Sequence, residues 1–175
     1  GSVGGAIKMN AGCYGSETKD VLEEVSVISK NGIKKILSKK DLNLEYRNSN
    51  ITNNDIITSA VFKGQFGVKE SIRSKIEHIK HKREKYQPLR TKTSGSTFKN
   101  PKGLYASKLI EESDCKGLTI GDAQVSLKHS NFIINLHKAT AKNIEDLGKA
   151  VQEKVHKKFN IKLEWEIQII GVSFD

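Results

Sequence analysis

The sequence predicts an α+β fold for this chain of 175 residues, and three observations lead to that prediction. A two-residue hairpin signal, Asn31-Gly32, joins two strand-like runs in a first part that is mostly β. Apolar residues recur at helical spacing over residues 68–82 and again from about 140 to 159. Further short strand-like runs lie close to the second of these stretches. The length allows one or two domains with a real core.

Local patterns define the elements of the first part. These are a glycine-rich turn, two hairpin strands, a short helical turn and a third strand, over residues 1–15, 21–29, 33–37, 38–42 and 55–63. Residues 68–82 are predicted to form an amphipathic helix whose apolar side packs against a core. Pro88 follows, and the residue before a proline is pushed out of the helical region. We therefore place a domain boundary near Pro88.

The second part is predicted to mix helices and strands. A short helix is expected over residues 103–112, and Gly117 is its expected C-cap. Residues 124–127 and 131–135 are predicted to be a strand pair. Thr140 or Asn143 is expected to cap a long helix that reaches Phe159, and residues 161–172 are expected to form a final strand.

The segment Ser94 to Pro101 combines two hydroxyls around a glycine with an aromatic residue, a cation, an amide and a proline. Gly95 permits close approach of the backbone, and Lys99 and Asn100 could hold an anionic or polar ligand. The helix expected after it would present an N-terminus that favours negative charge. On local composition alone, an ordinary Ser/Gly/Asn turn is the favoured interpretation, with Ser96 on a rigid loop.

The charge balance limits the classes of partner. Thirty Lys and Arg against twenty Asp and Glu give a formal net charge of +10, which suits nucleic acid, an acidic surface or a phosphorylated small molecule. The basic run over residues 69–92 is more simply a solvated helix face. Nucleic-acid binding has no recognised motif and few aromatics to support it. Cys13 and Cys115 lie far apart, so neither a disulfide framework nor a metal site is predicted. No membrane span or signal peptide is found, and a cytoplasmic location fits.

Several stretches, taken in order along the chain, carry a more specific signal. They are Gly1-Ser2-Val3-Gly4-Gly5-Ala6 with Met9-Asn10-Ala11-Gly12, then residues 46–49, 95–101, 128–135 and 166–171. Together they closely resemble the UDP-N-acetylenolpyruvoylglucosamine reductase (MurB) family, the flavoenzymes that complete UDP-N-acetylmuramate for peptidoglycan. The resemblance covers essentially the whole chain and reverses the preference for an ordinary turn at Ser96.

The resemblance implies a fold and a reaction. The fold is the second half of a vanillyl-alcohol-oxidase-type FAD-binding domain, over residues 1–80, followed by a substrate-binding domain over residues 81–175. NADPH reduces bound FAD, and hydride passes from flavin N5 to C3 of UDP-N-acetylglucosamine enolpyruvate while a protein acid protonates C2. A bacterial, cytoplasmic and monomeric enzyme is implied, without nucleic acid, membrane or metal.

The family's site residues carry over where the motifs match. Ser96 matches the proton donor, and Arg47 matches the active-site arginine, whose fork suits the enolpyruvyl carboxylate. Glu166 matches the active-site glutamate, which either positions the substrate or polarises the intermediate. Taken alone, Arg47 and Glu166 would be ordinary surface charges. The remaining implied contacts are Tyr46, Lys99 and Asn100 to substrate, and Ser2, Gly4, Gly5, Asn10 and Gly12 to FAD. His129 is interpreted as structural.

The chain also departs from the family pattern. Gln168 stands where a basic residue is usual, so one anion contact is lost or replaced. The short separation of Ser96 from Glu166 is typical of the branch without an inserted segment that caps the substrate, and a more open site is expected. The family's first flavin subdomain is missing from these 175 residues, so we expect this chain alone to bind FAD weakly and to be inactive. The alternative function is a non-catalytic nucleotide-sugar-binding module.

Overall fold

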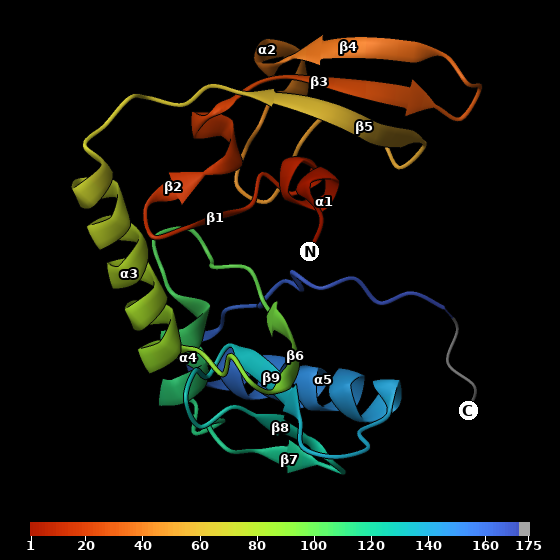
Figure 1. Ribbon diagram of the computed structural model, residues 1–175. Helices are drawn as coiled ribbons and strands as arrows, with labels where there is room; N and C mark the ends of the chain where they lie inside the picture. The colour runs from red at the N-terminus through yellow and green to blue at the C-terminus, as the bar shows by residue number, and fades with distance from the viewer. Residues whose placement is uncertain (172–175) are drawn as a thin grey trace. The chain divides into compact units, whose positions relative to one another are not determined.

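The computed structural model describes residues 1–171, and the chain divides into two compact units, Gly1–Lys75 and Ile76–Asp175 (Figure 1). Both units contain helices and antiparallel strands, which confirms the α+β prediction. Among the helices of residues 1–171, none is long and apolar enough to cross a membrane.

The N-terminal unit is built on a β-hairpin. Its elements are α1 (Val3–Lys8), β1 (Gly12–Cys13), β2 (Ser16–Glu17), a 3-10 turn (Thr18–Asp20), β3 (Leu22–Ser29), β4 (Lys34–Ser38), α2 (Lys39–Leu42) and β5 (Asp55–Phe62). The hairpin predicted at Asn31-Gly32 is confirmed, because β3 and β4 pair antiparallel. Its connection is longer than the predicted two residues, since Ser29 N donates to Ile33 O across the turn and, of the two turn residues, Gly32 alone has a positive φ, of 75°. β5 pairs with the other edge of β3, so the sheet order is β4-β3-β5. The predicted helical turn is also confirmed as α2, which Ser38 caps.

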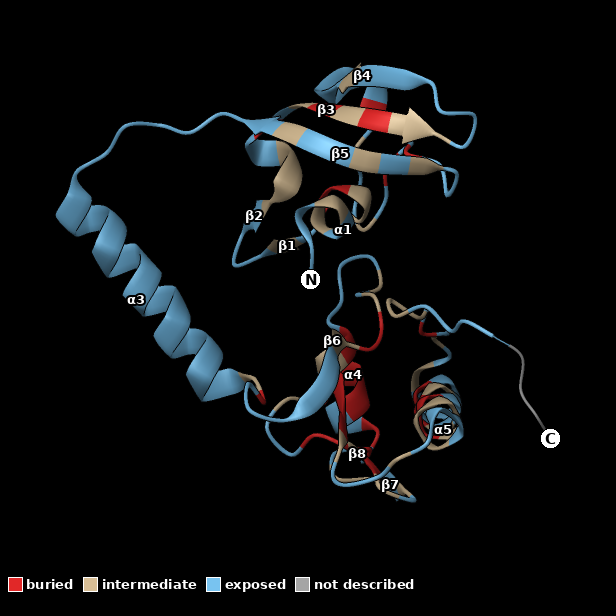
Figure 2. Ribbon diagram, turned by 45° about the vertical axis from the view of Figure 1, so that its right-hand side comes forward, coloured by how far each residue is buried: buried red, intermediate tan, exposed pale blue. Residues whose placement is uncertain are grey.

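One face of this sheet covers a small core. Its fully buried members are Ile7, Leu22, Val25, Val27, Leu42 and Ile51. β3 carries most of the burial in the sheet (Figure 2). Val25 and Val27 alternate as expected for a strand with one covered face. A register shift between Leu22 and Glu24 accounts for the three-residue spacing from Leu22 to Val25. Ile7 comes from α1, so this helix is anchored to the sheet by one buried side chain.

The start of the chain corrects one prediction. Residues 3–8 form a helix, although glycine-rich sequence indicated a turn. Ser2 caps the helix by accepting a hydrogen bond from the Gly5 amide at 3.1 Å. The cap and the burial of Ile7 together offset the low helix propensity of the two glycines.

The helix predicted over residues 68–82 is present as α3 (Lys69–Tyr86), but its predicted packing is wrong. None of its residues is buried, and Ile72, Ile76 and Ile79 are 45%, 57% and 40% exposed. The stripe supplies about one apolar residue per turn, fewer than the three or four per two turns that a core-facing helix usually carries. The helical periodicity therefore predicted the helix correctly, but the burial of its apolar side was predicted incorrectly.

The C-terminal unit packs helices on a four-stranded antiparallel sheet. Its elements are β6 (Lys92–Ser96), α4 (Ala106–Glu112), β7 (Thr119–Ile120), β8 (Ala123–Val125), β9 (Phe132–Asn135) and α5 (Ala141–Phe159), with strand order β6-β9-β8-β7. The predicted pairing of the strands now named β8 and β9 is confirmed. Of the two residues predicted to cap α5, Thr140 is the N-cap, and Asn143 completes a reciprocal capping box with it. The C-cap of α4 is Ser113, so the prediction of Gly117 was wrong; Gly117 instead donates to the Val125 carbonyl in the following turn.

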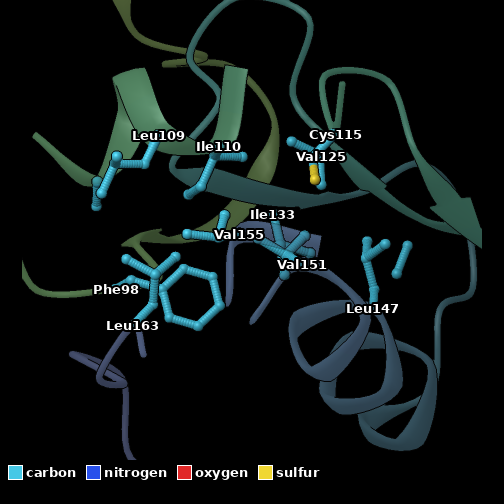
Figure 3. Packing of buried hydrophobic residues seen from close by; sticks show 12 residues of the cluster. Phe98, Leu109, Ile110, Cys115, Val125, Ile133, Leu147, Val151, Val155 and Leu163 are labelled. Atoms are coloured by element: carbon cyan, nitrogen blue, oxygen red, sulfur yellow. The ribbon is translucent and has the colours of Figure 1, made fainter. Parts of the chain in front are cut away.

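The core of this unit lies between the sheet, α4 and α5 (Figure 3). Leu147, Val151 and Val155 project from α5 at helical spacing, and Ile133 and Val125 meet them from the sheet. The predicted apolar stripe of this helix is confirmed. This stripe is buried, unlike that of α3, because the strands of the sheet supply apolar residues that pack against it.

The final strand predicted over residues 161–172 was wrong. In the part of the chain that the structure describes, the segment forms an isolated bridge between Phe98 and Trp165; Val172 lies outside the described residues. The pairing is completed by two backbone hydrogen bonds, from Glu166 N to Thr97 O at 2.9 Å and from Lys99 N to Glu164 O at 2.8 Å. So short a ladder holds the segment without the length of a regular strand.

Candidate functional site

Ser96 is placed by a bulge in β6. Thr93 pairs with Ile134 and Ser96 pairs with Phe132, so three steps along β6 match two along β9. Gly95 supplies the positive φ of 93° that the extra residue requires. Without the bulge, residues 93 and 96 would face opposite sides of the sheet; with it, both lie on the face of Phe132 and Ile134. The predicted rigid loop is thus the bulged end of a strand.

The backbone after Ser96 is held from both sides. On one side, Thr97 N donates to Asn131 O at 2.8 Å. On the other side, Thr97 O accepts from Glu166 N. Thr97 itself is 1% exposed, and its hydroxyl accepts a hydrogen bond from Ile133 N. The structure therefore brings Ser96 and Glu166 onto adjoining segments within one unit.

An aromatic stack fixes the same pairing from the core side. The ring centroids of Phe98 and Trp165 lie 4.9 Å apart. Trp165 in turn lies against Gly148 of α5, where an added Cβ would come within 1.9 Å of the indole ring. A side chain at position 148 would compete with the ring for its space. Gly148 thus permits the approach of α5 to the residue that precedes Glu166.

Lys99 and Asn100 both make contacts within the protein. The Lys99 ammonium lies 3.6 Å from the carboxylate of Glu164, its neighbour across the short ladder. Asn100 accepts a hydrogen bond from Ala106 N at 2.9 Å through its side-chain oxygen. Tyr105, the N-cap residue, makes no side-chain capping bond, so Asn100 satisfies a first-turn donor of α4 in its place. The expectation of a helix after this segment is confirmed, three residues later than predicted.

Arg47 lies in a tight turn of the N-terminal unit. Glu45 and Asn48 bridge around it, and Arg47 adopts a φ of 54°. Its guanidinium donates to the Gly12 carbonyl at 3.1 Å and stacks over the ring of Tyr46, with 4.9 Å from Cζ to the ring centroid. The structure therefore brings together Tyr46, Arg47 and the strand that begins at Gly12.

Asn10 connects that turn to the N-terminal helix. Its side chain is fully buried; the amide nitrogen donates to Glu17 Oε2 and to the Glu45 carbonyl, and the oxygen accepts from Lys19 N at 2.9 Å. The other predicted cofactor residues are more accessible: Ser2 and Gly5 are exposed, and Gly4 is half-buried. Gly12 is needed for close packing, since a Cβ there would lie 2.6 Å from the Ser16 carbonyl oxygen.

The pKa values of two groups, Glu17 beside Asn10 and His129 beside Asn131, are shifted from their ordinary values. The hydrogen bond from Lys19 lowers the pKa of Glu17, against the opposing effect of its desolvation, and the amide of Asn10 lowers it further. Burial lowers the pKa of His129, whose ring packs edge-on against Phe132 with centroids 4.6 Å apart. Its Nδ1 accepts from Asn131 N at 3.3 Å. Within residues 1–171, no group of three or more His, Cys, Asp or Glu side chains is arranged to hold a metal ion.

Replacing Asn10 with alanine is expected to lower the free energy of unfolding by about 2 kcal/mol, because this buried side chain makes three part-buried hydrogen bonds that alanine cannot replace. Asn43→Ala is the matched control. Asn43 has nearly the same backbone conformation, with φ 41° against 40°, but its side chain is exposed. Urea unfolding followed by circular dichroism measures both. Equal losses would attribute the effect to the backbone conformation rather than to the hydrogen bonds.

No sequence pattern assigns a role to Asn131 beyond its place in the stretch over residues 128–135. Its buried side-chain amide nevertheless forms two hydrogen bonds with the backbone of Phe98. A polar residue directly before a strand is common, so the signal available in the sequence was weak.

Comparison with known proteins gives consistent matches. Residues 87–170 match the C-terminal domain of UDP-N-acetylenolpyruvoylglucosamine reductase. Reductases of that name from Rhizorhabdus wittichii and Clostridium novyi are 44% and 46% identical, over 99% and 98% of this chain and 56% of each relative. The crystal structure of the reductase (MurB) from Thermus caldophilus is similar with a TM-score of 0.85 and 39% identity, over 95% of this chain and 59% of that one. The chain thus spans somewhat more than half the length of these relatives.

Proposed function

Because the chain belongs to the UDP-N-acetylenolpyruvoylglucosamine reductase family, we propose that it is part of an NADPH-dependent flavoenzyme that reduces UDP-N-acetylglucosamine enolpyruvate to UDP-N-acetylmuramate. The observation that carries the proposal is the pairing of Thr97 with Glu166, since it places the predicted proton donor and glutamate on adjoining segments. We assign FAD binding to residues 1–80 and substrate binding to residues 81–175, in a cytoplasmic monomer.

Ser96 is the proposed donor of the proton to C2 of the enolpyruvyl group. A hydroxyl is a weak acid, so its loss of a proton must be stabilised by nearby positive charge or a relay to water. Lys99, three residues along the same rigid segment, is the proposed cation. Its pairing with Glu164 leaves it 34% exposed, which keeps the ammonium accessible to an anionic ligand.

Glu166 and Arg47 have separate proposed roles. Glu166 positions the substrate or polarises the developing charge, and its backbone bond to Thr97 limits how far it can move. Arg47 binds the enolpyruvyl carboxylate through its guanidinium, which the Gly12 carbonyl and the Tyr46 ring orient. Tyr46 and Asn100 are proposed to contact the substrate beside them.

The residues proposed to hold FAD fit such a group. Ser2 and Gly5 are exposed, and Gly5 carries no side chain that would keep a flat ring system away. Gly4 is half-buried, and its Cβ position faces Ile57. Asn10 and Gly12 would support this surface from within: Asn10, which follows α1, bonds to Glu17 and Lys19, and Gly12 permits the close pairing of β1 with β2. FAD, when bound, would supply the hydride for C3 after accepting it from NADPH.

Stopped-flow spectroscopy of the flavin-loaded complete enzyme, of which this chain is proposed to be a part, tests the function. NADPH should bleach the flavin absorbance, and UDP-N-acetylglucosamine enolpyruvate added without oxygen should restore it. Bleaching that the substrate fails to reverse would refute the reductase assignment. Tight nucleotide-sugar binding without any turnover would instead support a non-catalytic binding module.

A further inference from the structure

We propose that Asn131 is a positioning residue that holds the Ser96 end of β6 in its reactive place. The inference rests on the proposed function for the role of Ser96, but its structural basis is independent of that role. It concerns a residue to which the family's motifs, as matched above, gave no function.

Asn131 makes a two-point contact with the backbone of Phe98. Its side-chain oxygen accepts from Phe98 N at 3.0 Å, and its side-chain nitrogen donates to Phe98 O at 2.8 Å. Both bonds are buried, and Asn131 is only 4% exposed. A side-chain amide has the same donor and acceptor arrangement as a peptide group, so it satisfies Phe98 as a neighbouring strand would.

The amide fills a gap in the pairing of the segment. The 164–166 segment bonds with Thr97 O and Lys99 N, so the N–H and C=O of Phe98 face away from it. On the opposite side β9 begins only at Phe132, one residue after Asn131. The Asn131 side chain thus extends the sheet past the end of the strand. Residues 97–99 are consequently held along both edges.

The contact from Asn131 to Phe98 should affect the reaction rate as well as the stability of the fold. Phe98 lies two residues from Ser96, and Thr97 between them carries the hydrogen bond to Glu166. Loosening Phe98 would therefore displace the proposed proton donor relative to the glutamate. Misplacement of a reacting group by about 1 Å can cost on the order of 100-fold in rate.

Asn135, at the far end of β9 from Asn131, provides a matched control. Its side chain makes the same two-point contact with Ala139, accepting from the amide at 3.0 Å and donating to the carbonyl at 3.4 Å. Asn135 pairs with Lys92, which lies at the end of β6 that is remote from Ser96. Losing its amide should cost stability without disturbing Ser96.

Hydrogen exchange of the 175-residue chain tests the bracing without any chemistry. Asn131→Leu and Asn131→Asp should raise the exchange rate of peptides covering residues 96–100 by about tenfold or more, since opening free energies govern protection. Asn135→Leu should leave that rate unchanged. Equal exchange in the Asn131 and Asn135 variants would overturn the proposal.

The two half-reactions of the flavin-loaded enzyme test the consequence for rate. Asn131→Leu should slow flavin reoxidation by substrate about 10- to 100-fold and leave reduction by NADPH unchanged. Asn131→Asp should approach the parent rate at low pH, where the acid form still donates and accepts, and should lose rate as the pH rises. The charged and titrating groups beside this position are His129, Lys99, Glu164 and Glu166. They are present in both parent and variant, so comparing the two pH–rate profiles separates their titration from that of the new aspartate.

The outcomes separate the inference from the proposed function. If Asn131→Asp reoxidised its flavin at the parent rate at every pH, the positioning role would be overturned. If the parent enzyme itself fails to be reoxidised by substrate, the proposed function is wrong, and the exchange comparison alone decides whether Asn131 holds this segment. Asn131→Asp at low pH also covers the case in which Asn131→Leu does not fold.

Discussion

Ser96→Ala is expected to slow reoxidation of the flavin by UDP-N-acetylglucosamine enolpyruvate by about 10²- to 10⁴-fold, the usual contribution of a positioned acid. Reduction of the flavin by NADPH should continue at the parent rate, because that half-reaction needs no proton at C2. Rapid-mixing absorbance measurements follow each half-reaction separately. The large effect is expected because the bulge places the backbone that carries the Ser96 hydroxyl, and an alanine leaves no donor there.

Ser94→Ala is the control for this experiment. Ser94 is an exposed residue of the same bulge, two positions before Ser96, so its loss tests whether any change in the bulge slows the reaction. It should leave both half-reactions close to the parent. An equal loss of both half-reactions in Ser96→Ala would point to damaged flavin binding and contradict the role of proton donor.

Gly148→Ala is expected to lower the free energy of unfolding of the C-terminal unit by about 2–3 kcal/mol, as overpacked core positions do. The new Cβ would lie 1.9 Å from the Trp165 ring, which stacks on Phe98 and so has little room to withdraw. In most helices the same substitution stabilises by up to about 1 kcal/mol, so the expected sign is reversed. Urea unfolding followed by circular dichroism measures the change.

Two comparisons attribute this effect to the ring. Gly4→Ala, in α1, places its Cβ at an ordinary 3.6 Å from Ile57 and should be neutral or slightly stabilising. In a Trp165→Leu background the smaller side chain should accept the added methyl, so Gly148→Ala should then cost little. The same loss in both backgrounds would show that the destabilisation has another source.

Elements with strong local signals were predictable from the sequence. Asn31-Gly32 dictates a hairpin, and Thr140 with the stripe of α5 dictates a capped amphipathic helix. The errors arose where long-range contacts decide. α1 depends on Ser2 and on the burial of Ile7, and residues 161–171 are held by a two-bond ladder that no local pattern encodes.

The candidate site was predictable in part, for the same reason. Ser96, Arg47 and Glu166 were identified by resemblance, and their catalytic roles stay predictions. The bulge at Gly95 and the contact from Asn131 to Phe98 depend on strand register. Register is a property of two segments distant in sequence, so local patterns do not encode these two features. The cap that Asn100 provides is local, but it depends on α4 beginning at Ala106, three residues later than predicted.

The stack of Trp165 on Phe98 also gives the protein a built-in optical reporter. Trp165 is the only tryptophan in the sequence, so all indole emission comes from the residue next to Glu166. Emission wavelength and quenching depend on the polarity and packing around that ring alone. Ligand binding at this edge of the C-terminal unit can therefore be followed by native fluorescence, without introducing a label into the segment that carries Ser96.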